Sequence, residues 1–211
     1  MIRLRKGNPP AILVEKAAEW TAEYLAALVA GGEIPETVRR RYRHEDVKAA
    51  IREESHSKCI YCESPVDFGQ TDHILPVSKC PHLVVDWDNL ALVCTECNTH
   101  KKDYHDTSLP LINPYVEDPA DFLIFLGPLV MAVAGNQRGQ TTQRQIKLNR
   151  PALLERRQRR LEWLEPLLHQ WASQPPGTLK DLLKETILEE ARDDKEYAAT
   201  VRACLATAKV V

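Results

Sequence analysis

The pattern of hydrophobic and polar positions predicts helices at both ends of the chain. From about residue 11 to residue 30, apolar residues recur at spacings of three and four, which indicates an amphipathic helix that stops at Gly31-Gly32. A second helix is predicted from about His44 to Ser55, because its apolar residues fall on one face. Residues 59–105 carry few strong helix signals.

The second half of the chain begins with apolar runs that are too short for helices. Residues 122–126 and 129–133 are apolar and separated by turn residues, which predicts a hairpin. From about Thr141 to the end the pattern is helical, and Pro151 suits a first helical turn. Pro175-Pro176-Gly177 separates two long helices. We expect an α+β chain that folds as one compact unit.

Four of the six cysteines form two C-x-x-C pairs, Cys59 with Cys62 and Cys94 with Cys97. A two-residue spacer turns both thiolates toward one ion, so two such pairs predict a tetrahedral, structural zinc site. A redox C-x-x-C, which needs only one pair, and coincidence are the alternatives. Cys80 and Cys204 stand alone, and we interpret them as small buried residues or free thiols.

The composition is that of a globular protein. The 211 residues include 28 Lys and Arg against 30 Asp and Glu, and 44% are hydrophobic. This excludes a disordered chain, a collagen-like chain and an extreme polycation. No apolar run approaches the roughly 20 residues of a membrane helix, and the first ten residues lack the apolar stretch of a signal peptide. We therefore expect a cytoplasmic protein without a membrane partner.

A polar motif lies inside the cysteine frame. Asp72-His73-Ile74-Leu75-Pro76 stands between the pairs, Asn89-Leu90 precedes the second pair, and Asn98 and Lys101 follow it. In this order the residues resemble the HNH endonucleases, whose pattern is C-x-x-C, D-H-I-x-P, N-L and C-x-x-C-[HN]-x-x-K. The resemblance implies a ββα-metal fold, in which a strand–loop–strand–helix unit holds one catalytic divalent ion and zinc clamps the unit from outside.

Flanking motifs narrow the resemblance. Trp87-Asp88-Asn89, Leu111-Ile112-Asn113-Pro114 and Leu148-Asn149-Arg150 are similar to motifs in the HNH proteins of antiphage systems. These are the PtuB-like nucleases of Septu and the HNH proteins encoded beside retrons, and the likeness covers about residues 1–160. It implies an ATPase partner of the PtuA type. The chain departs from the pattern at Lys102, where glycine is common, and at Cys80, where a larger residue is expected.

The resemblance divides the chain into three regions. Residues 1–58 form an N-terminal helical region, residues 59–106 the small zinc-bound HNH core, and residues 107–211 a hairpin and a C-terminal helical region. The predicted fold class is therefore a ββα-metal core flanked by helices on both sides.

Phosphodiester cleavage requires an activated water and stabilisation of the negative charge that develops on the phosphate. An imidazole whose pKa is near neutrality suits the first task, and a divalent ion suits the second. The resemblance implies that His73 is the base, that Asp72 and Asn98 hold Mg²⁺ or Mn²⁺, and that Asn89 fixes the loop that presents His73. Each role has an alternative: Asp72 as a turn or surface acid, His73 as a structural histidine, Asn89 as a turn residue and Asn98 as a helix-terminus residue.

Basic residues lie mostly outside the predicted core. Residues 59–137 contain three basic and eleven acidic residues, whereas residues 138–160 contain eight basic residues and one acid. The core alone would repel a polyanion, so we expect flanking cations to attract phosphates. The predicted nucleic-acid contacts are Lys101, Lys102, Arg144, Lys147 and Arg150. Residues 39–43 form a second basic run. The alternative is a solvated helix face whose cations pair with acids.

Three functions fit these patterns. The first is a metal-dependent HNH endonuclease, acting on DNA in preference, in an antiphage complex that delivers its substrate. The second is a zinc-stapled module that binds nucleic acid or protein without catalysis, and the third is a nuclease directed at RNA such as tRNA. Asp72, His73 and Asn98 favour a nuclease over a binding module, because binding alone does not need an acid, an imidazole and an amide at these positions.

Overall fold

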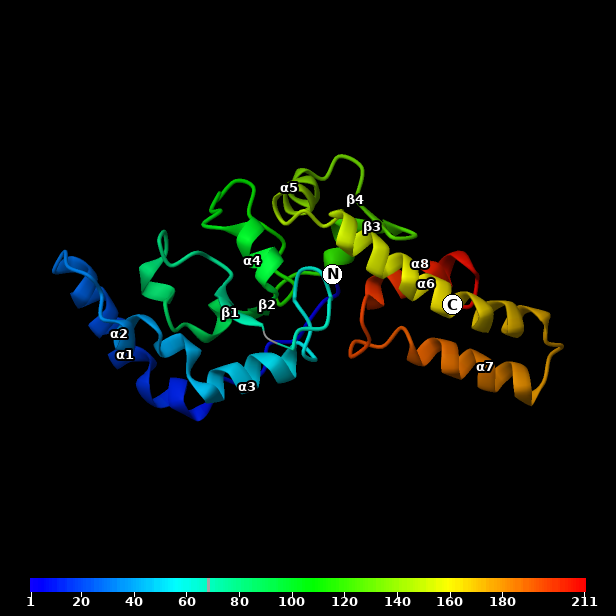
Figure 1. The fold of residues 1–211 in the computed structure, drawn as a ribbon, viewed down its shortest axis with the longest axis horizontal. Helices are drawn as coiled ribbons and strands as arrows, with labels where there is room; N and C mark the ends of the chain where they lie inside the picture. The colour runs from blue at the N-terminus through cyan, green and yellow to red at the C-terminus, as the bar shows by residue number, and fades with distance from the viewer. Residues whose placement is uncertain (68) are drawn as a thin grey trace.

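A computed structural model describes residues 1–67 and 69–211. Figure 1 shows the N-terminal helices, the small strand–strand–helix unit and the C-terminal helices following one another along the longest axis. The larger helices are α1 (Ala11–Val29), α3 (Glu45–Glu54), α5 (Gln137–Gln145), α6 (Pro151–Ser173), α7 (Thr178–Glu189) and α8 (Ala198–Thr207). The predicted mixed fold of helices and few strands is confirmed.

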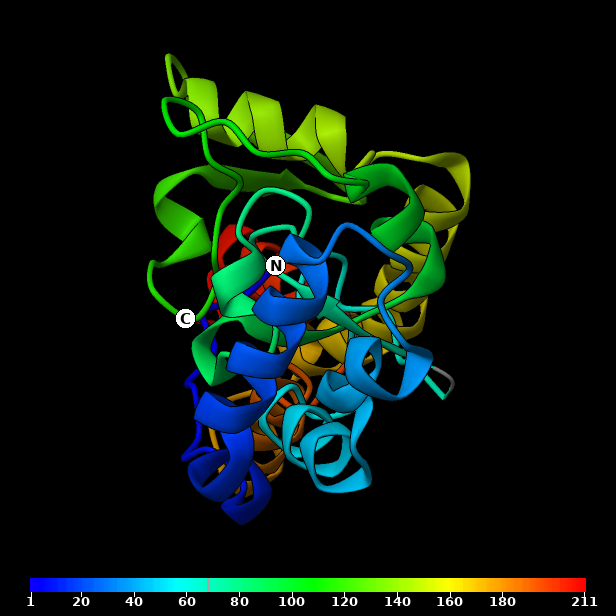
Figure 2. The same cartoon turned by 90° about the vertical axis from the view of Figure 1, so that its left-hand side faces the viewer.

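The N-terminal helices follow the pattern of the sequence. Helix α1 begins directly after Pro9-Pro10 and ends at Val29, just before the two glycines. After the short helices α2 (Glu36–Arg39) and η1 (Arg41–Arg43), α3 turns Val47 and Ile51 into the core, where it packs on the central strands. Figure 2, which turns this side toward the viewer, shows α1 running across the front of the central unit.

The central unit consists of β1 (Gln70–His73), β2 (Leu90–Val93) and α4 (Thr95–Lys101). The two strands are antiparallel, with Asp72 opposite Ala91 and His73 opposite Leu90. All four residues of β2 are buried, and its continuous apolar sequence fits a strand covered on both faces. Helix α4 then packs back against β1. This is the strand–loop–strand–helix order that the resemblance implied.

The hairpin predicted from the two short apolar runs is present as β3 (Leu123–Leu126) and β4 (Leu129–Ala132). The following helix, α5, begins at Gln137, four residues before the position we predicted. Helix α6 has Pro151 in its first turn, and the predicted break at Pro175-Pro176-Gly177 lies between α6 and α7. Three 3-10 turns complete the elements: η2 (Pro81–Leu83), η3 (Trp87–Asn89) and η4 (Pro119–Asp121).

Two apolar clusters stabilise the chain. The larger one joins the N-terminal segment, α1, α3, the cysteine loops, both sheets and the beginning of α6, so it runs through all three predicted regions. The smaller one lies where α6, α7 and α8 meet and contains Leu164, Ile187, Val201, Leu205 and Val210. In the described part of the chain, no helix combines the length and the apolar character that crossing a membrane requires.

The end of α4 gives a physical reason for the glycine that the resemblance leads us to expect at the position of Lys102. Lys102 follows the helix with φ 52° and ψ −136°, a conformation that side chains rarely adopt. Such strain costs about 1–3 kcal/mol, and the extra freedom of glycine in the unfolded chain costs about 0.5–1 kcal/mol.

We therefore expect Lys102→Gly to stabilise the protein by about 1 kcal/mol, which raises the melting temperature by roughly 2–4 °C in a chain of this size. Thermal unfolding followed by circular dichroism measures this change. Lys147 also has positive φ, so the melting temperature of Lys147→Gly provides the comparison with that of Lys102→Gly. A melting temperature of Lys102→Gly at or below that of the wild type contradicts the strain argument.

Candidate active site and cysteine centre

The four cysteines of the two C-x-x-C pairs meet at one point. Their sulfur atoms all lie within 4.8 Å of one another, and the Sγ atoms of Cys62 and Cys94 are 3.7 Å apart. A tetrahedron with Zn–S bonds of about 2.3 Å has edges of about 3.8 Å, whereas a disulfide requires about 2.05 Å. All four are free cysteines, so the cluster has the dimensions and the donor chemistry of a zinc site.

Backbone hydrogen bonds shape both cysteine loops. The Glu63 N–H donates to the Cys59 carbonyl, and the Ile60 N–H donates to the Leu92 carbonyl of β2. At the second loop the Cys97 N–H donates to the Cys94 sulfur, which caps the first turn of α4. Four thiolates this close together repel one another, so a bound cation is needed to hold them at this distance.

The imidazole of His73 is buried and held at one nitrogen. Its Nε2 lies 2.7 Å from the Val84 carbonyl oxygen, and its ring packs at 4.4 Å from the ring of Tyr42. Since a carbonyl can only accept, Nε2 carries the hydrogen and Nδ1 of the neutral ring has the free lone pair. Burial lowers the pKa of His73 and so favours this neutral form. The ring is oriented as a proton acceptor requires.

The side-chain amide of Asn89 binds the loop that follows His73, both as an acceptor and as a donor. Its Oδ1 accepts from the Leu75 N–H at 2.7 Å, and its Nδ2 donates to the carbonyls of Leu75 at 3.0 Å and Leu83 at 3.3 Å. These bonds join both ends of the segment between β1 and β2. They hold the segment that supplies the Val84 carbonyl to His73.

Asp72 lies on β1 and contacts α4, and Asn98 lies on α4 and contacts β1. Gln70 and Asp72 lie on one face of β1, and Asn98 and Lys101 lie on one face of α4. Asn98 Nδ2 donates to Gln70 Oε1, and Lys101 Nζ lies 3.0 Å from Asp72 Oδ2. The second contact is an ion pair without the alignment of a hydrogen bond, so this buried Asp72 oxygen retains accepting capacity.

The predicted nucleic-acid contacts separate into two groups. Lys102, Arg144 and Lys147 are exposed, as expected. Lys101 differs from the prediction, because its side chain is only 1% exposed and ends on Asp72. Arg150 differs as well, because its side chain is 8% exposed and ends at the cysteine centre. In both cases a nearby negative group, or a group that becomes negative on binding metal, draws the cation inward.

The basic residues of the run 138–160 also fall into two groups, exposed cations and cations that are paired or buried. Arg157 is 1% exposed and donates to the Leu148 carbonyl at 2.8 Å, while Arg160 pairs with Glu190 at 2.5 Å. Arg138 forms a two-bond contact with Glu117. Half of the cations expected to attract phosphates therefore hold the chain together, and the alternative of paired charges applies to them.

Sequence patterns missed two contributors to the site. Gln70 contacts Asn98 from β1, and its position two residues before Asp72 on a strand was the available signal. Tyr42 packs on His73 and brings Arg43 with it, since Arg43 Nε donates to the Tyr42 hydroxyl at 3.0 Å. The run at residues 39–43 was recognised only as basic, and nothing local placed it beside His73.

An antiparallel strand pair and a helix, with a four-cysteine centre at their base and an Asp-His pair on the first strand, define the class of the protein. A family model described as HNH endonuclease matches residues 59–104. The chain therefore carries an HNH endonuclease domain at residues 59–104, which supports a nuclease.

Two relatives narrow the comparison to PtuB-type proteins. The chain is 28% identical to the Septu protein PtuB of Bacillus thuringiensis, over 97% of this chain and 82% of the relative. It is 25% identical to the Septu protein PtuB of Bacillus mycoides, over 55% of this chain and 51% of the relative. The match to the first relative extends far beyond the HNH domain on both sides.

Proposed function

We propose that the protein is a metal-dependent endonuclease that hydrolyses phosphodiester bonds, preferentially of DNA, within an antiphage defence complex. The observation that carries the proposal is the pairing on β1 of an anchored imidazole with an adjacent carboxylate. His73 has Nδ1 free because Nε2 is bound to the Val84 carbonyl, and Asp72 lies beside α4, which carries Asn98. The proposed HNH core, residues 59–106, contains all of these groups.

Each residue has one role in the proposed reaction. His73 Nδ1 accepts a proton from the water whose oxygen forms the new bond to phosphorus. The bond to the 3′-oxygen breaks, and that oxygen takes a proton from a solvent water molecule, which leaves a 3′-hydroxyl and a 5′-phosphate. Asn89 acts by positioning, because its three backbone hydrogen bonds hold the segment that orients His73. Lys101 holds the Asp72 carboxylate in place through their ion pair.

The donors between β1 and α4 suit a hard divalent cation. Asp72 offers a carboxylate oxygen without a hydrogen bond, and Asn98 uses its amide nitrogen on Gln70, which leaves its carbonyl oxygen free. Oxygen ligands with remaining water positions fit Mg²⁺ or Mn²⁺. When bound, such an ion stabilises the charge that develops on the phosphate and on the leaving oxygen.

Exposed cations near the site can bind the phosphates of the substrate. Lys102, Arg144 and Lys147 remain accessible. Arg43 is exposed beside Tyr42 and makes no ion pair among the residues that the structure describes. Contacts of this kind bind phosphates without reading sequence. With a net charge of −2, the chain is poorly equipped to bind bulk DNA alone. We therefore propose an ATPase of the PtuA type as the partner that delivers substrate, as the likeness to PtuB supports.

The proposal is tested by parallel digestion of supercoiled plasmid and tRNA with the zinc-loaded protein, alone and with a PtuA-type ATPase. We expect nicking of the plasmid with Mg²⁺ or Mn²⁺ and none with EDTA, and slower cleavage of tRNA under the same conditions. Preferential tRNA cleavage would reassign the substrate to RNA. Absence of cleavage of either substrate, with the ATPase present, would favour the zinc-stapled binding module.

A further inference from the structure

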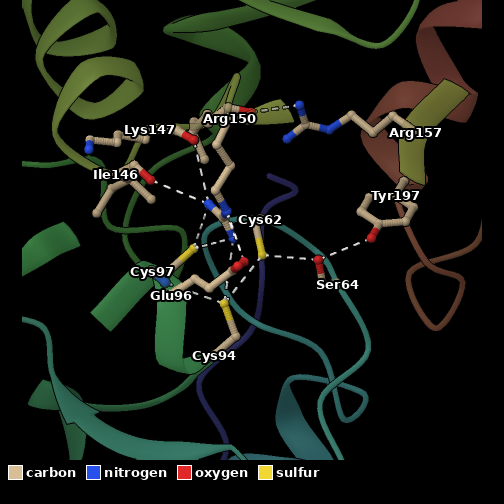
Figure 3. Close-up of polar contacts among 11 residues, drawn as sticks. Cys62, Ser64, Cys94, Glu96, Cys97, Ile146, Lys147, Arg150, Arg157 and Tyr197 are labelled. Carbon is tan, nitrogen blue, oxygen red and sulfur yellow. Dashed lines mark hydrogen bonds and ion pairs between the residues drawn. The ribbon is translucent and has the colours of Figure 1, made fainter. Parts of the chain in front are cut away.

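Arg150 reaches the cysteine centre from outside the HNH core. Its Nη1 and Nη2 atoms both lie 3.5 Å from the Cys97 sulfur, and Nη2 lies 3.8 Å from the Cys94 sulfur. Figure 3 shows the guanidinium directed at these sulfurs from the start of α6, more than fifty residues further along the chain. The side chain is 8% exposed, so water contributes little to its solvation.

The charge balance of the centre explains why a cation belongs there. Four thiolates around one Zn²⁺ leave a formal charge of about −2. Cys59, Cys62 and Cys97 are buried, so the excess charge is poorly solvated. A guanidinium compensates part of it and donates N–H groups to the sulfurs. Arginine keeps its proton in proteins, so this positive charge remains beside the sulfurs although the side chain is buried.

The chain around Arg150 is built to hold this side chain in place. Arg150 is the residue before α6, whose first position is Pro151, and its backbone N–H donates to the Lys147 carbonyl at 3.0 Å. The Val130 N–H donates to Asn149 Oδ1 at 2.8 Å, and Asn149 Nδ2 donates to the Val130 carbonyl at 2.7 Å. Glu96, in the first turn of α4, binds Arg150 Nε at 3.0 Å. The guanidinium is therefore fixed between the sulfurs and a carboxylate of the same loop.

A neutral contact on the other side of the centre differs in kind. Cys62 Sγ lies 3.3 Å from the Ser64 hydroxyl, which lies 3.0 Å from the Tyr197 hydroxyl just before α8. This chain of contacts orients a sulfur but adds no charge. Among the residues that the structure describes, Arg150 is the cation within hydrogen-bond distance of the cysteine sulfurs. It explains the Leu148-Asn149-Arg150 motif, which the nuclease chemistry does not use.

We propose that Arg150 is a positioning residue of the four-cysteine centre, which raises its affinity for zinc and docks the α5–α6 junction onto the HNH core. The inference rests on the zinc site of the proposed function. Outer partners of metal ligands typically contribute 10- to 100-fold to metal affinity. Because the contact joins two distant segments, zinc binding and docking of the junction stabilise each other.

The test compares zinc affinity in Arg150→Gln and Arg144→Gln. Arg144 lies six residues earlier, is exposed and does not contact the sulfurs, so it controls for loss of one arginine. Competition with a chromophoric chelator should show that Arg150→Gln binds zinc about 10- to 100-fold more weakly than the wild type. Arg144→Gln should match the wild type. Arg150→Lys keeps the charge but not the planar fork, and its affinity should lie between the two.

A second readout covers the case in which Arg150→Gln folds poorly. Hydrogen exchange of the zinc-loaded Arg150→Lys protein should show faster exchange at residues 146–154 than in the wild type, with no change in α7. Equal zinc affinity of Arg150→Gln and Arg144→Gln would overturn the inference while leaving the zinc site intact. A wild type that binds no zinc would overturn both. Weaker zinc binding with unchanged exchange at the junction would overturn the docking half.

Discussion

Replacement of His73 by alanine is expected to lower the rate of nucleic-acid cleavage by about 10²- to 10⁴-fold, which is the usual contribution of a general base. The physical reason is the fixed orientation of the ring. Val84 occupies Nε2 and leaves Nδ1 as the free acceptor, and burial keeps the imidazole neutral by lowering its pKa. The measurement is the initial rate of plasmid nicking with Mg²⁺ or Mn²⁺, at matched zinc content.

The control for His73→Ala is His169→Ala. His169 lies on α6, its side chain is 79% exposed, and its neighbour is Glu165 of the same helix. We expect His169→Ala to cleave at the wild-type rate. The zinc content of both variants should equal that of the wild type, since neither histidine contacts the cysteine cluster. Equal cleavage by His73→Ala and His169→Ala would show that another group activates the water and that His73 has a structural role.

Local sequence patterns were sufficient wherever one short segment determines its own structure. The apolar spacing of α1, the two runs of the β3–β4 hairpin and the proline break before α7 each predicted an element that the structure contains. The cysteine cluster was predictable for a related reason. A C-x-x-C loop brings two sulfurs together by itself, so only the meeting of two loops depended on the rest of the fold.

The functions of individual charges could not be predicted in the same way. By residue type alone, Lys101 and Arg150 are expected at the surface. The pattern of apolar residues along a helix does not show whether a neighbouring element carries a negative partner for them. Their partners, Asp72 and the sulfurs of Cys94 and Cys97, are 29 to 56 residues away and come close only through the packing of β1, α4 and α6. The resemblance to a family located the motif, but it did not show which cations stabilise the fold and which reach solvent.

Loss of zinc is expected to unfold the central unit. Structural zinc sites bind with an apparent free energy of about 10–16 kcal/mol, which is comparable to the whole stability of a typical domain, about 5–15 kcal/mol. In this chain the cysteine loops also carry the backbone bond from Ile60 to β2 and cap α4 through Cys94. A strong chelator, or Cys97→Ser, should therefore remove the cooperative thermal transition of the strands and α4, and with it all cleavage.

Cys204→Ser is the matched control, because Cys204 lies on α8, half-buried and outside the cluster. It should keep one zinc per chain and a melting temperature within a few degrees of the wild type, since a substitution away from a metal or a polar network typically costs about 1 kcal/mol. The C-terminal cluster of α6, α7 and α8 has its own apolar contacts, so helical signal should survive in the Cys97→Ser protein. If Cys97→Ser melts like Cys204→Ser and still cleaves, the four cysteines do not form a structural metal site. If both lose the transition, the cysteines matter through packing and not through the ion.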